Sequence, residues 1–285
     1  MKNIILRTIS GAVYIGLIIS AILLLENSPY AYLALMSFFV ALGMNEIYTM
    51  TRKEEHESWL IIMVDMLGGI GLFLTMYLMS KEEVSSQGMW LIPLASYLVV
   101  RFIIQLYRPK QNAVHSLTRS FFAIGYVALP LGMLNTIIAI TAPRILLGIF
   151  AFIWINDTGA FLSGITLGKH KLFKRVSPKK SWEGFIGGVL LCIAAAYATH
   201  HWFNDFFQCP PLGIWIGLSI VVALAATFGD FTESLIKRTL EVKDSGKLIP
   251  GHGGILDRID SLLLVAPATL VYLAIVVYNI KAFIH

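Results

Sequence analysis

Charged residues are scarce in this chain. Aspartate, glutamate, lysine and arginine make up 14% of its 285 residues, whereas hydrophobic residues make up 57%. Soluble domains carry about 25% charged and about 45–50% apolar residues, so this balance excludes an ordinary soluble domain. Only two cysteines are present, too few for a disulfide framework or a thiolate metal site. With a mean hydropathy of +0.74, the apolar residues indicate an integral membrane protein.

Long apolar runs recur along the whole chain. A helix needs about 20 apolar residues to cross the hydrocarbon core, so we expect an all-α polytopic membrane protein with nine transmembrane helices. Their expected ranges are 4–25, 30–48, 59–79, 89–106, 121–141, 145–164, 183–203, 212–228 and 261–283. The first run ends in Leu-Leu-Leu-Glu-Asn rather than at a small-residue cleavage site, so we interpret it as a retained anchor. Since no repeat or linker divides the chain, residues 1–285 are expected to form a single integral membrane domain.

The lysines and arginines indicate the orientation of these helices. With the N-terminus in the cytoplasm, nine spans place 18 of the 22 bases in cytoplasmic segments and three on the opposite side. Such an excess is typical of cytoplasmic loops. We therefore expect a protein of the cytoplasmic (inner) membrane, with the C-terminus on the opposite side. Because the net charge of +5 gathers beside the membrane, lipid and not nucleic acid is the expected contact.

Polar residues concentrate in two expected cytoplasmic loops, about 165–182 and 229–260. The second loop holds 11 of the chain's 39 charged residues in 32 positions, a density more typical of functional loops than of connectors. Asn156 and Asp157 lie late in the sixth expected span. A carboxylate at that depth normally faces a bundle interior or an aqueous cavity, so Asp157 is a candidate functional residue. A structural helix–helix hydrogen bond through Asn156 or Thr158 is the alternative.

The first polar loop is basic. It contains Gly-Lys-His-Lys at 168–171 and Ser-Pro-Lys-Lys-Ser-Trp-Glu-Gly at 177–184. Lysine binds phosphate as a point charge, and the amides of a helix that begins after Ser181 favour an anion. The loop is therefore a candidate phosphate-binding segment, although an anchor on anionic lipid head groups would explain the same bases.

The second polar loop combines acids, bases and glycines. Asp257 and Asp260 are three residues apart, so on a helix they project from one face and repel each other unless they share a proton or a cation. Asp230, at the end of the eighth span, approaches them if the loop folds back. Mg²⁺ commonly binds one or two carboxylates together with substrate phosphates. The loop therefore predicts phosphoryl or nucleotidyl transfer to a lipid, with its bases supplying charge for a triphosphate.

Two further acids lie inside expected spans. Asp65 is in the third span and Glu46 is near the end of the second. We expect each either to line the cavity or to pair with a base such as Arg101.

The second polar loop also carries a family resemblance. It reads Ser234-Leu-Ile-Lys237-Arg238, then Lys243-Asp244-Ser-Gly, then Leu248-Ile-Pro-Gly-His252-Gly-Gly-Ile-Leu-Asp257-Arg258-Ile-Asp260. Over these 27 positions it resembles the signature of the phosphatidate cytidylyltransferases, also called CDP-diacylglycerol synthases. The upstream Asp-Thr-Gly-Ala at 157–160 and the segment 177–184 also look like that family's. The resemblance implies a transferase of phospholipid biosynthesis that converts CTP and phosphatidate into CDP-diacylglycerol and pyrophosphate, with Mg²⁺ or another divalent cation.

This resemblance implies roles for individual residues, within a catalytic half at about 145–265. The implied metal ligands are Asp230, Asp257 and Asp260, with Asp157 or Asp244 completing the site. The residues expected to act in catalysis are Asp230, Lys237, Asp244, Asp257 and Asp260. Those expected to bind substrate are Lys169, Lys179, Lys180, Ser181, Lys237, Arg238, Lys243, His252 and Arg258. Because the phosphatidate phosphate is already ionised, catalysis reduces to positioning and charge neutralisation. The resemblance leaves a homodimer open.

Two other classes of protein share some of these features. A transporter also buries acids in a helix bundle, but repeated halves with interrupted helices are expected there, and the sequence shows no repeat. A CDP-alcohol phosphotransferase also binds metal through aspartates. Its pattern of Asp-Gly, Ala-Arg and spaced aspartates is absent from this sequence.

Overall fold

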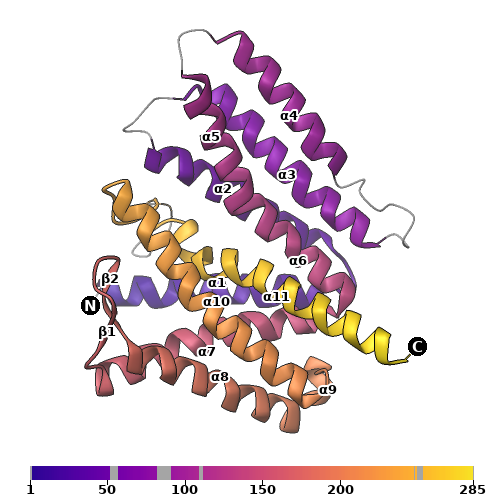
Figure 1. Cartoon of the computed structure of the whole chain (residues 1–285), viewed down its shortest axis with the longest axis vertical. Coiled ribbons are helices and arrows are strands. Elements are labelled where there is room, and N and C mark those ends of the chain that lie inside the picture. The colour runs from indigo at the N-terminus through magenta and orange to yellow at the C-terminus, as the bar shows by residue number, and fades with distance from the viewer. Residues whose placement is uncertain are drawn as a thin grey trace. The chain divides into compact units, whose positions relative to one another are not determined.

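The computed structural model describes residues 2–51, 57–81, 91–108, 112–246, 248 and 253–284, most of which are helical (Figure 1). The chain forms two compact units from discontinuous segments. Unit 1 contains Met1–Ala139 and Leu240–Ile259, and unit 2 contains Ile140–Thr239 and Asp260–His285.

The helices of unit 1 are α1 (Lys2–Leu24), α2 (Tyr30–Met50), α3 (Trp59–Lys81), α4 (Leu91–Leu106), α5 (Ala113–Ala123), a π-helix (Ile124–Ala128) and α6 (Leu129–Ile140). Unit 2 contains α7 (Pro143–Leu167), β1 (Lys171–Phe173), β2 (Ser177–Ser181), α8 (Trp182–Trp202), α9 (Asn204–Phe207) and α10 (Leu212–Thr239). The last helix, α11 (Leu256–Ile284), begins in unit 1 and continues in unit 2.

Seven of the described helical segments are long and apolar enough to cross a membrane, judged by length and composition. They are Tyr30–Met50, Trp59–Ser80, Ala113–Ile140, Pro143–Leu167, Trp182–Trp202, Leu212–Thr239 and Leu256–Val276. Two further apolar segments, Thr8–Leu24 and Leu91–Leu106, are shorter. The expected all-α polytopic architecture is therefore confirmed, and the count of nine spans stays a prediction.

The outward-facing side chains of these helices are apolar. Ile186 and Leu190 on α8 are 52% and 60% exposed, whereas Asp65 and Arg101 of unit 1 are completely buried. A soluble protein keeps such charged residues at its surface. Apolar residues outside and paired charges inside are the distribution that a lipid environment favours.

Helix α10 is longer than the sequence predicts. Its expected span ends at 228, but the helix continues to Thr239, and α11 begins at Leu256 instead of 261. Hydropathy detects only the apolar part of a helix, and beyond that part Phe231 and Glu233 remain buried against the unit. Much of the expected loop at 229–260 is therefore helical.

The fifth membrane segment also begins earlier than expected. It starts at Ala113 and not at 121, because Asn112 caps it by accepting a hydrogen bond from the amide of His115 at 3.1 Å. Farther along, Pro130 lacks an amide hydrogen and crowds the carbonyl of the preceding turn. The helix takes the wider π form over Ile124–Ala128, immediately before that proline.

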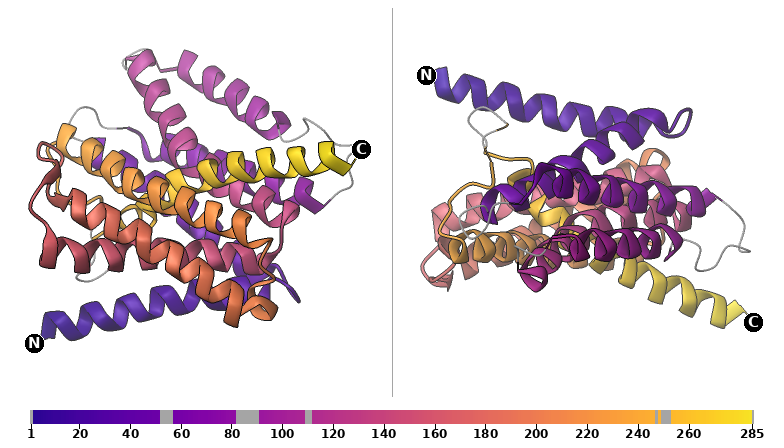
Figure 2. Two further views of the ribbon diagram at one scale, coloured as in Figure 1. Left: turned by 60° about the horizontal axis from the view of Figure 1, so that its bottom comes forward. Right: turned by 90° about the horizontal axis from the view of Figure 1, so that it is seen from above.

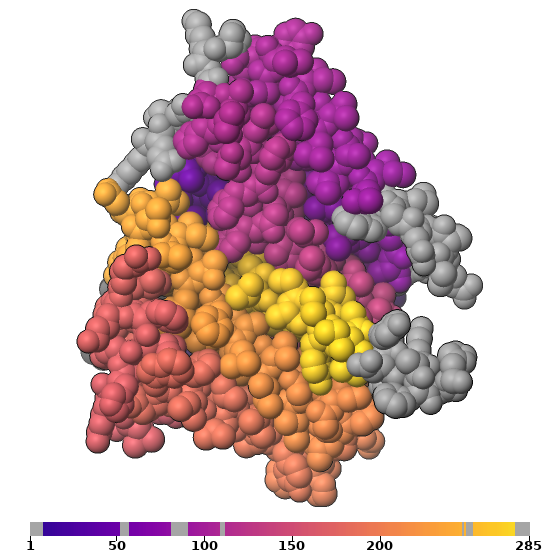
Figure 3. Space-filling view, viewed as in Figure 1, coloured from indigo at the N-terminus to yellow at the C-terminus, as the bar shows by residue number. Residues whose placement is uncertain are grey.

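The first polar loop forms a hairpin that the sequence analysis did not predict. Strands β1 and β2 are antiparallel, with Lys171 opposite Ser181. In Figure 3 the hairpin lies beside α10 of the same unit, and the rings of Phe173 and Phe231 meet edge to face with their centroids 5.0 Å apart. Three residues in β1 are too few for an alternating pattern to be recognised in the sequence.

Helices α7 and α8 pack closely in unit 2, side by side in the views of Figures 1 and 2. Small residues allow this approach. A Cβ atom on Gly188 would lie 2.5 Å from Oδ1 of Asn156, and one on Gly187 would lie 2.0 Å from Oγ of Ser163. The glycines of α8 therefore fix the position of α7 and of the polar residues that it carries.

Candidate functional site

The end of β2 is joined directly to the start of α8. Ser181 is the N-cap residue of α8, and its Oγ accepts a hydrogen bond from the amide of Gly184 at 3.2 Å. The amide of Trp182 donates to the carbonyl of His170 at 2.9 Å, which fixes the hairpin to the helix. The predicted helix start after Ser181 is confirmed. These two hydrogen bonds fix the end of β2 and thereby the place of the two lysines that precede Ser181.

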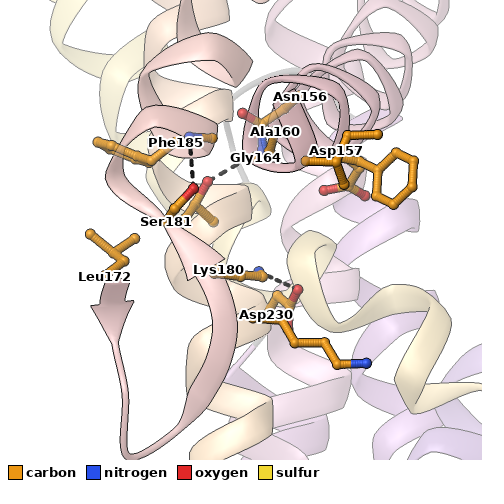
Figure 4. A pocket seen from close by; sticks show the side chains of 14 residues that line it. Asn156, Asp157, Ala160, Gly164, Leu172, Lys180, Ser181, Phe185 and Asp230 are labelled. Atoms are coloured by element: carbon orange, nitrogen blue, oxygen red, sulfur yellow. Dashed lines mark hydrogen bonds and ion pairs between the residues drawn. The ribbon is translucent and has the colours of Figure 1, made fainter. Parts of the chain in front are cut away.

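A cavity of about 360 Å³ opens beside this hairpin within unit 2 (Figure 4). Its apolar wall includes Phe161, Ile165 and Phe185. Its polar lining residues are Asn156 and Asp157 from α7, Lys179, Lys180 and Ser181 from β2, and Thr227 and Asp230 from α10. The structure thus brings five predicted site residues to one cavity: Asp157, Lys179, Lys180, Ser181 and Asp230.

Lys180 and Asp230 form an ion pair at this cavity (Figure 4). The ammonium of Lys180 also lies 4.6 Å from the ring centroid of Phe231, a favourable cation–π geometry. The other carboxylate oxygen of Asp230 accepts a hydrogen bond from Ser234 at 3.2 Å. A predicted phosphate-binding base and a predicted metal ligand are therefore partners in this structure.

Asp230 also lies beside the last helix, as the sequence analysis expected. A Cβ atom on Gly229 would lie 2.9 Å from the main-chain oxygen of Asp260 and 3.0 Å from Cα of Ser261. The absence of a side chain at Gly229 therefore permits α10 and α11 to cross at contact distance. This crossing places two predicted carboxylates on adjacent helices of one unit.

Three carboxylates of unit 2, Asp157, Asp230 and Asp260, form an acidic group that also includes the base Lys237. Asp260 lies within electrostatic range of Asp230, Asp157 and Lys237. Lys237 is in turn paired with the fully buried Glu233. Hard carboxylate oxygens fit a divalent cation such as Mg²⁺, which needs only one or two of them when phosphates and waters complete its shell. Across the described ranges, no three histidine, cysteine, aspartate or glutamate side chains are arranged to hold a metal ion.

Asn156 supports the structural alternative that its sequence position left open. Its Nδ2 donates to Thr227 Oγ1 on α10 at 3.3 Å, a helix–helix hydrogen bond. Its Oδ1 is buried and accepts no hydrogen bond from the described residues. Thr158 instead bonds to the carbonyl of Trp154 in its own helix at 2.8 Å. Asn156 therefore joins two helices, while Asp157 next to it lines the cavity.

Asp257 belongs to a second polar group, in unit 1. Its Oδ2 accepts hydrogen bonds from the amides of Ser245 at 3.0 Å and Gly254 at 2.9 Å, and the hydroxyl oxygen of Ser245 lies 3.0 Å from the same atom. Gly253 has a φ of +80°, a conformation that favours glycine. One oxygen of Asp257 therefore joins Ser245 to Gly254, and the role of Asp257 as a metal ligand stays a prediction.

The remaining predicted residues lie in several places. Lys169 lines a separate shallow hollow, with His170 and Trp182. Arg238 is exposed in the last turn of α10. Lys243, Asp244 and Arg258 are exposed in unit 1. His252 lies outside the described residues.

Sequence reasoning missed the role of Glu46. The carboxylate neither pairs with Arg101 nor lines the cavity of unit 2. It accepts hydrogen bonds from the main-chain amides of Ile255 and Leu256 at 2.9 and 2.8 Å. Asp65 does pair with Arg101, with 3.3 Å between Oδ1 and Nε. The position of Glu46 inside an apolar run indicated that it has a buried partner. Its partners are main-chain amides, which every residue except proline carries, so the sequence could not identify them.

The sequence of this chain matches a family of known enzymes. The sequence profile of the cytidylyltransferase family matches residues 5–276, and the chain belongs to that family. It is 34% identical over 211 residues to a protein of Staphylococcus haemolyticus named phosphatidate cytidylyltransferase, with 72% of this chain and 79% of the relative covered.

Shorter alignments reach higher identity. Proteins with the same name from Staphylococcus aureus and Haemophilus influenzae are 46% and 45% identical over 120 and 124 residues. These two alignments cover 41% and 43% of this chain. The chain spans less than half of these two relatives, 44% and 43% of their lengths.

Proposed function

We propose that the protein transfers CMP from CTP to phosphatidate and releases pyrophosphate, which makes it a phosphatidate cytidylyltransferase. The observation that carries this proposal is the cavity of unit 2, where Lys179, Lys180, Asp157 and Asp230 face one space beside apolar helices. Lysines suit the phosphates of both substrates, and the apolar wall suits a lipid. Family membership supports nucleotidyl transfer, and the relatives' names supply phosphatidate as the acceptor.

The proposed reaction needs little proton transfer. An ionised phosphate oxygen of phosphatidate attacks the α-phosphorus of CTP, the bond to the bridging oxygen of the β-phosphate breaks, and pyrophosphate leaves. Lys179 and Lys180 neutralise phosphate charge, and the defined end of β2 keeps them in place. Catalysis then consists of orientation and electrostatic stabilisation of the transition state.

We further propose a divalent cation, Mg²⁺, at the acidic group of Asp230 and Asp260, with Asp257 and Asp157 or Asp244 as further ligands. When bound, the ion supplies positive charge to the triphosphate and the leaving pyrophosphate. Asp230 would hold the ion in place of its present partner Lys180, and the ammonium of Lys180 would then be available to a phosphate. Lys237, Arg238, Lys243, His252 and Arg258 are proposed to contact substrate from the signature segment.

The proposed topology has nine spans, a cytoplasmic N-terminus and a cytoplasmic site within residues 145–265, in a bacterial inner membrane. The 18 to 3 distribution of bases supports it. Single cysteines at the exposed positions Lys174 and Lys243, in a variant without Cys192 and Cys209, should resist an impermeant thiol reagent in intact cells. A cysteine at Asp205, expected on the opposite side, should react. Labelling at 174 or 243 from outside refutes this orientation.

Labelled CTP tests the reaction. Purified protein is incubated with phosphatidate, Mg²⁺ and CTP labelled on either the α- or the γ-phosphorus, and lipid is extracted into chloroform. A cytidylyltransferase carries the α label into lipid and leaves the γ label in pyrophosphate. A CTP-dependent lipid kinase carries the γ label into lipid, and a transporter incorporates neither.

The control for this assay is Asp230→Asn, which keeps the size of the side chain but removes its charge. The proposal predicts lipid labelling by wild type far above that by Asp230→Asn. If γ label enters the lipid, or if α label never exceeds the control, the assignment is wrong.

A further inference from the structure

The carboxylate of Glu46 lies at the centre of the signature segment in unit 1. Glu46 is only 5% exposed and comes from α2. Its Oε1 accepts from the amide of Ile255 at 2.9 Å, and its Oε2 accepts from the amide of Leu256 at 2.8 Å and the hydroxyl of Ser245 at 2.7 Å. Residues about 200 positions apart in the chain therefore meet at one side chain.

These bonds satisfy donors that a helix start leaves open. Ile255 and Leu256 stand at the beginning of α11, where main-chain amides have no partner within the helix. A carboxylate there also interacts favourably with the helix dipole. Glu46 thus caps α11 from another helix.

Ser245 links Glu46 to Asp257. Its hydroxyl contacts Oε2 of Glu46 at 2.7 Å and Oδ2 of Asp257 at 3.0 Å, and its amide contacts the same oxygen of Asp257 at 3.0 Å. A shift of Glu46 would therefore move Ser245 and, through Ser245, the carboxylate of Asp257, which is a proposed metal ligand.

Glycines bring the main chain to within contact of Glu46. A Cβ atom on Gly246 would lie 2.6 Å from Oε1, and one on Gly254 would lie 2.3 Å from Oε2. Gly43, one turn before Glu46 on α2, would bring a Cβ atom within 3.8 Å of Leu256 and Ile259. Gly246 and Gly254 thus fit closely around this side chain, which explains these two signature glycines without any substrate contact.

We propose that Glu46 is a positioning residue for the proposed cytidylyltransferase: it holds residues 245–246 and 253–257 in the geometry in which Asp257 would bind the cation. The inference rests on the proposed function. Glu46 touches neither substrate nor the reacting atoms in this role. Its partners all belong to the signature segment, whereas the partners of Asp65, the other acid of the N-terminal spans, belong to the helices of its own bundle.

The test compares Glu46→Gln with Glu57→Gln, a second buried glutamate of unit 1 that is paired with Arg108 and not with this segment. Ser245→Ala removes one of the bonds and serves as the second variant. Hydrogen exchange is measured on peptides covering 244–259 and on peptides from the other helices. CMP incorporation into lipid is measured against Mg²⁺ concentration.

The expected result is local. Exchange in peptides of 253–259 should be at least about tenfold faster in Glu46→Gln, with the other helices unchanged, since hydrogen bonds to a charged group are lost. The Mg²⁺ concentration that gives half-maximal activity should rise several-fold in Glu46→Gln. It should rise less in Ser245→Ala and should not change in Glu57→Gln.

Three results overturn the inference: unchanged exchange at 253–259, equally faster exchange in every helix, or faster local exchange with an unchanged Mg²⁺ dependence. If wild type transfers no CMP at all, the proposed function fails. The exchange data then still decide whether Glu46 orders the segment.

Discussion

Lys180 on β2 and Asp230 on α10 are ion-pair partners with only partial burial, the two side chains being 30% and 32% exposed. A fully buried pair is costly to separate, but a pair that reaches the cavity can exchange partners with ions from solution. The proposed exchange, in which a phosphate and a cation replace the two partners, requires this accessibility. The ring of Phe231 lies 4.6 Å from the same ammonium and gives Lys180 a second partner at the cavity.

Replacing Lys180 tests this exchange. In Lys180→Met the aliphatic length is kept and the charge is lost, so kcat/KM for CTP should fall by about 10- to 100-fold, or about 1.4–2.7 kcal/mol of transition-state stabilisation. Lys174→Met removes one charge from the same hairpin outside the cavity lining and should change kcat/KM by less than about twofold. Equal losses in both variants would mean that only the overall charge of the hairpin matters.

Gly229→Ala tests the crossing of α10 and α11. The new Cβ atom meets the main chain of Asp260 and Ser261 and cannot be accommodated by rotation of a side chain. Overpacking of this kind costs about 1–3 kcal/mol, so the unfolding temperature in detergent should fall and activity should fall with it. Gly213→Ala on the same helix meets nothing within 4 Å and should leave both unchanged. If Gly229→Ala changes neither the unfolding temperature nor the activity, the contact at Gly229 does not determine the positions of Asp230 and Asp260.

Much of the fold and part of the site can be predicted from the sequence. Apolar runs locate the membrane helices because lipid exposure demands them. Ser181 predicts a helix start because its hydroxyl satisfies a free amide. The approach of Asp230 to the last helix was expected on the condition that the loop between the two helices folds back.

Other features depend on tertiary contacts that no local pattern records. The polar end of α10 is held by burial of Phe231 and Glu233, and the hairpin is too short to show periodicity. Glu46 was expected to seek a base or the cavity, but main-chain amides supplied its partners. Amides are present at every position, so a sequence cannot single out the ones that are used.

Glu57 predicts a pH dependence of stability outside the spans. Burial raises the pKa of Glu57, but hydrogen bonds from Ser116 and Arg108 and the charge of Arg108 outweigh it, so its pKa lies below the usual 4.5. A carboxyl group whose pKa is lower in the folded protein than in the unfolded chain stabilises the fold at pH values above its unfolded-state pKa. This stabilisation is lost as the pH falls through its folded-state pKa. The difference in unfolding temperature between wild type and Glu57→Gln should therefore be full at neutral pH and shrink below about pH 4.5. A constant difference would contradict this assignment.

The buried pair Asp65–Arg101 has a different prediction, because both side chains are completely buried. Asp65 also accepts from Tyr97 at 2.7 Å and Ser120 at 2.6 Å, and Arg101 donates to Ser116 at 2.7 Å. Removing one charge leaves the other without a counter-charge. Asp65→Asn should therefore lower the free energy of unfolding by about 3–5 kcal/mol.

The double variant Asp65→Asn/Arg101→Met separates the pair's own energy from the cost of isolating a charge. With both charges gone, the helices of unit 1 keep an apolar and hydrogen-bonded interior, so the double variant should be more stable than Asp65→Asn alone. Since coupled sites are not additive, the double-mutant cycle measured by unfolding in detergent should give an interaction energy of at least about 1 kcal/mol. Simple addition of the two single effects would show that Arg101 is held by its serine and glutamine neighbours, and that Asp65 stabilises the bundle through its hydroxyl donors alone.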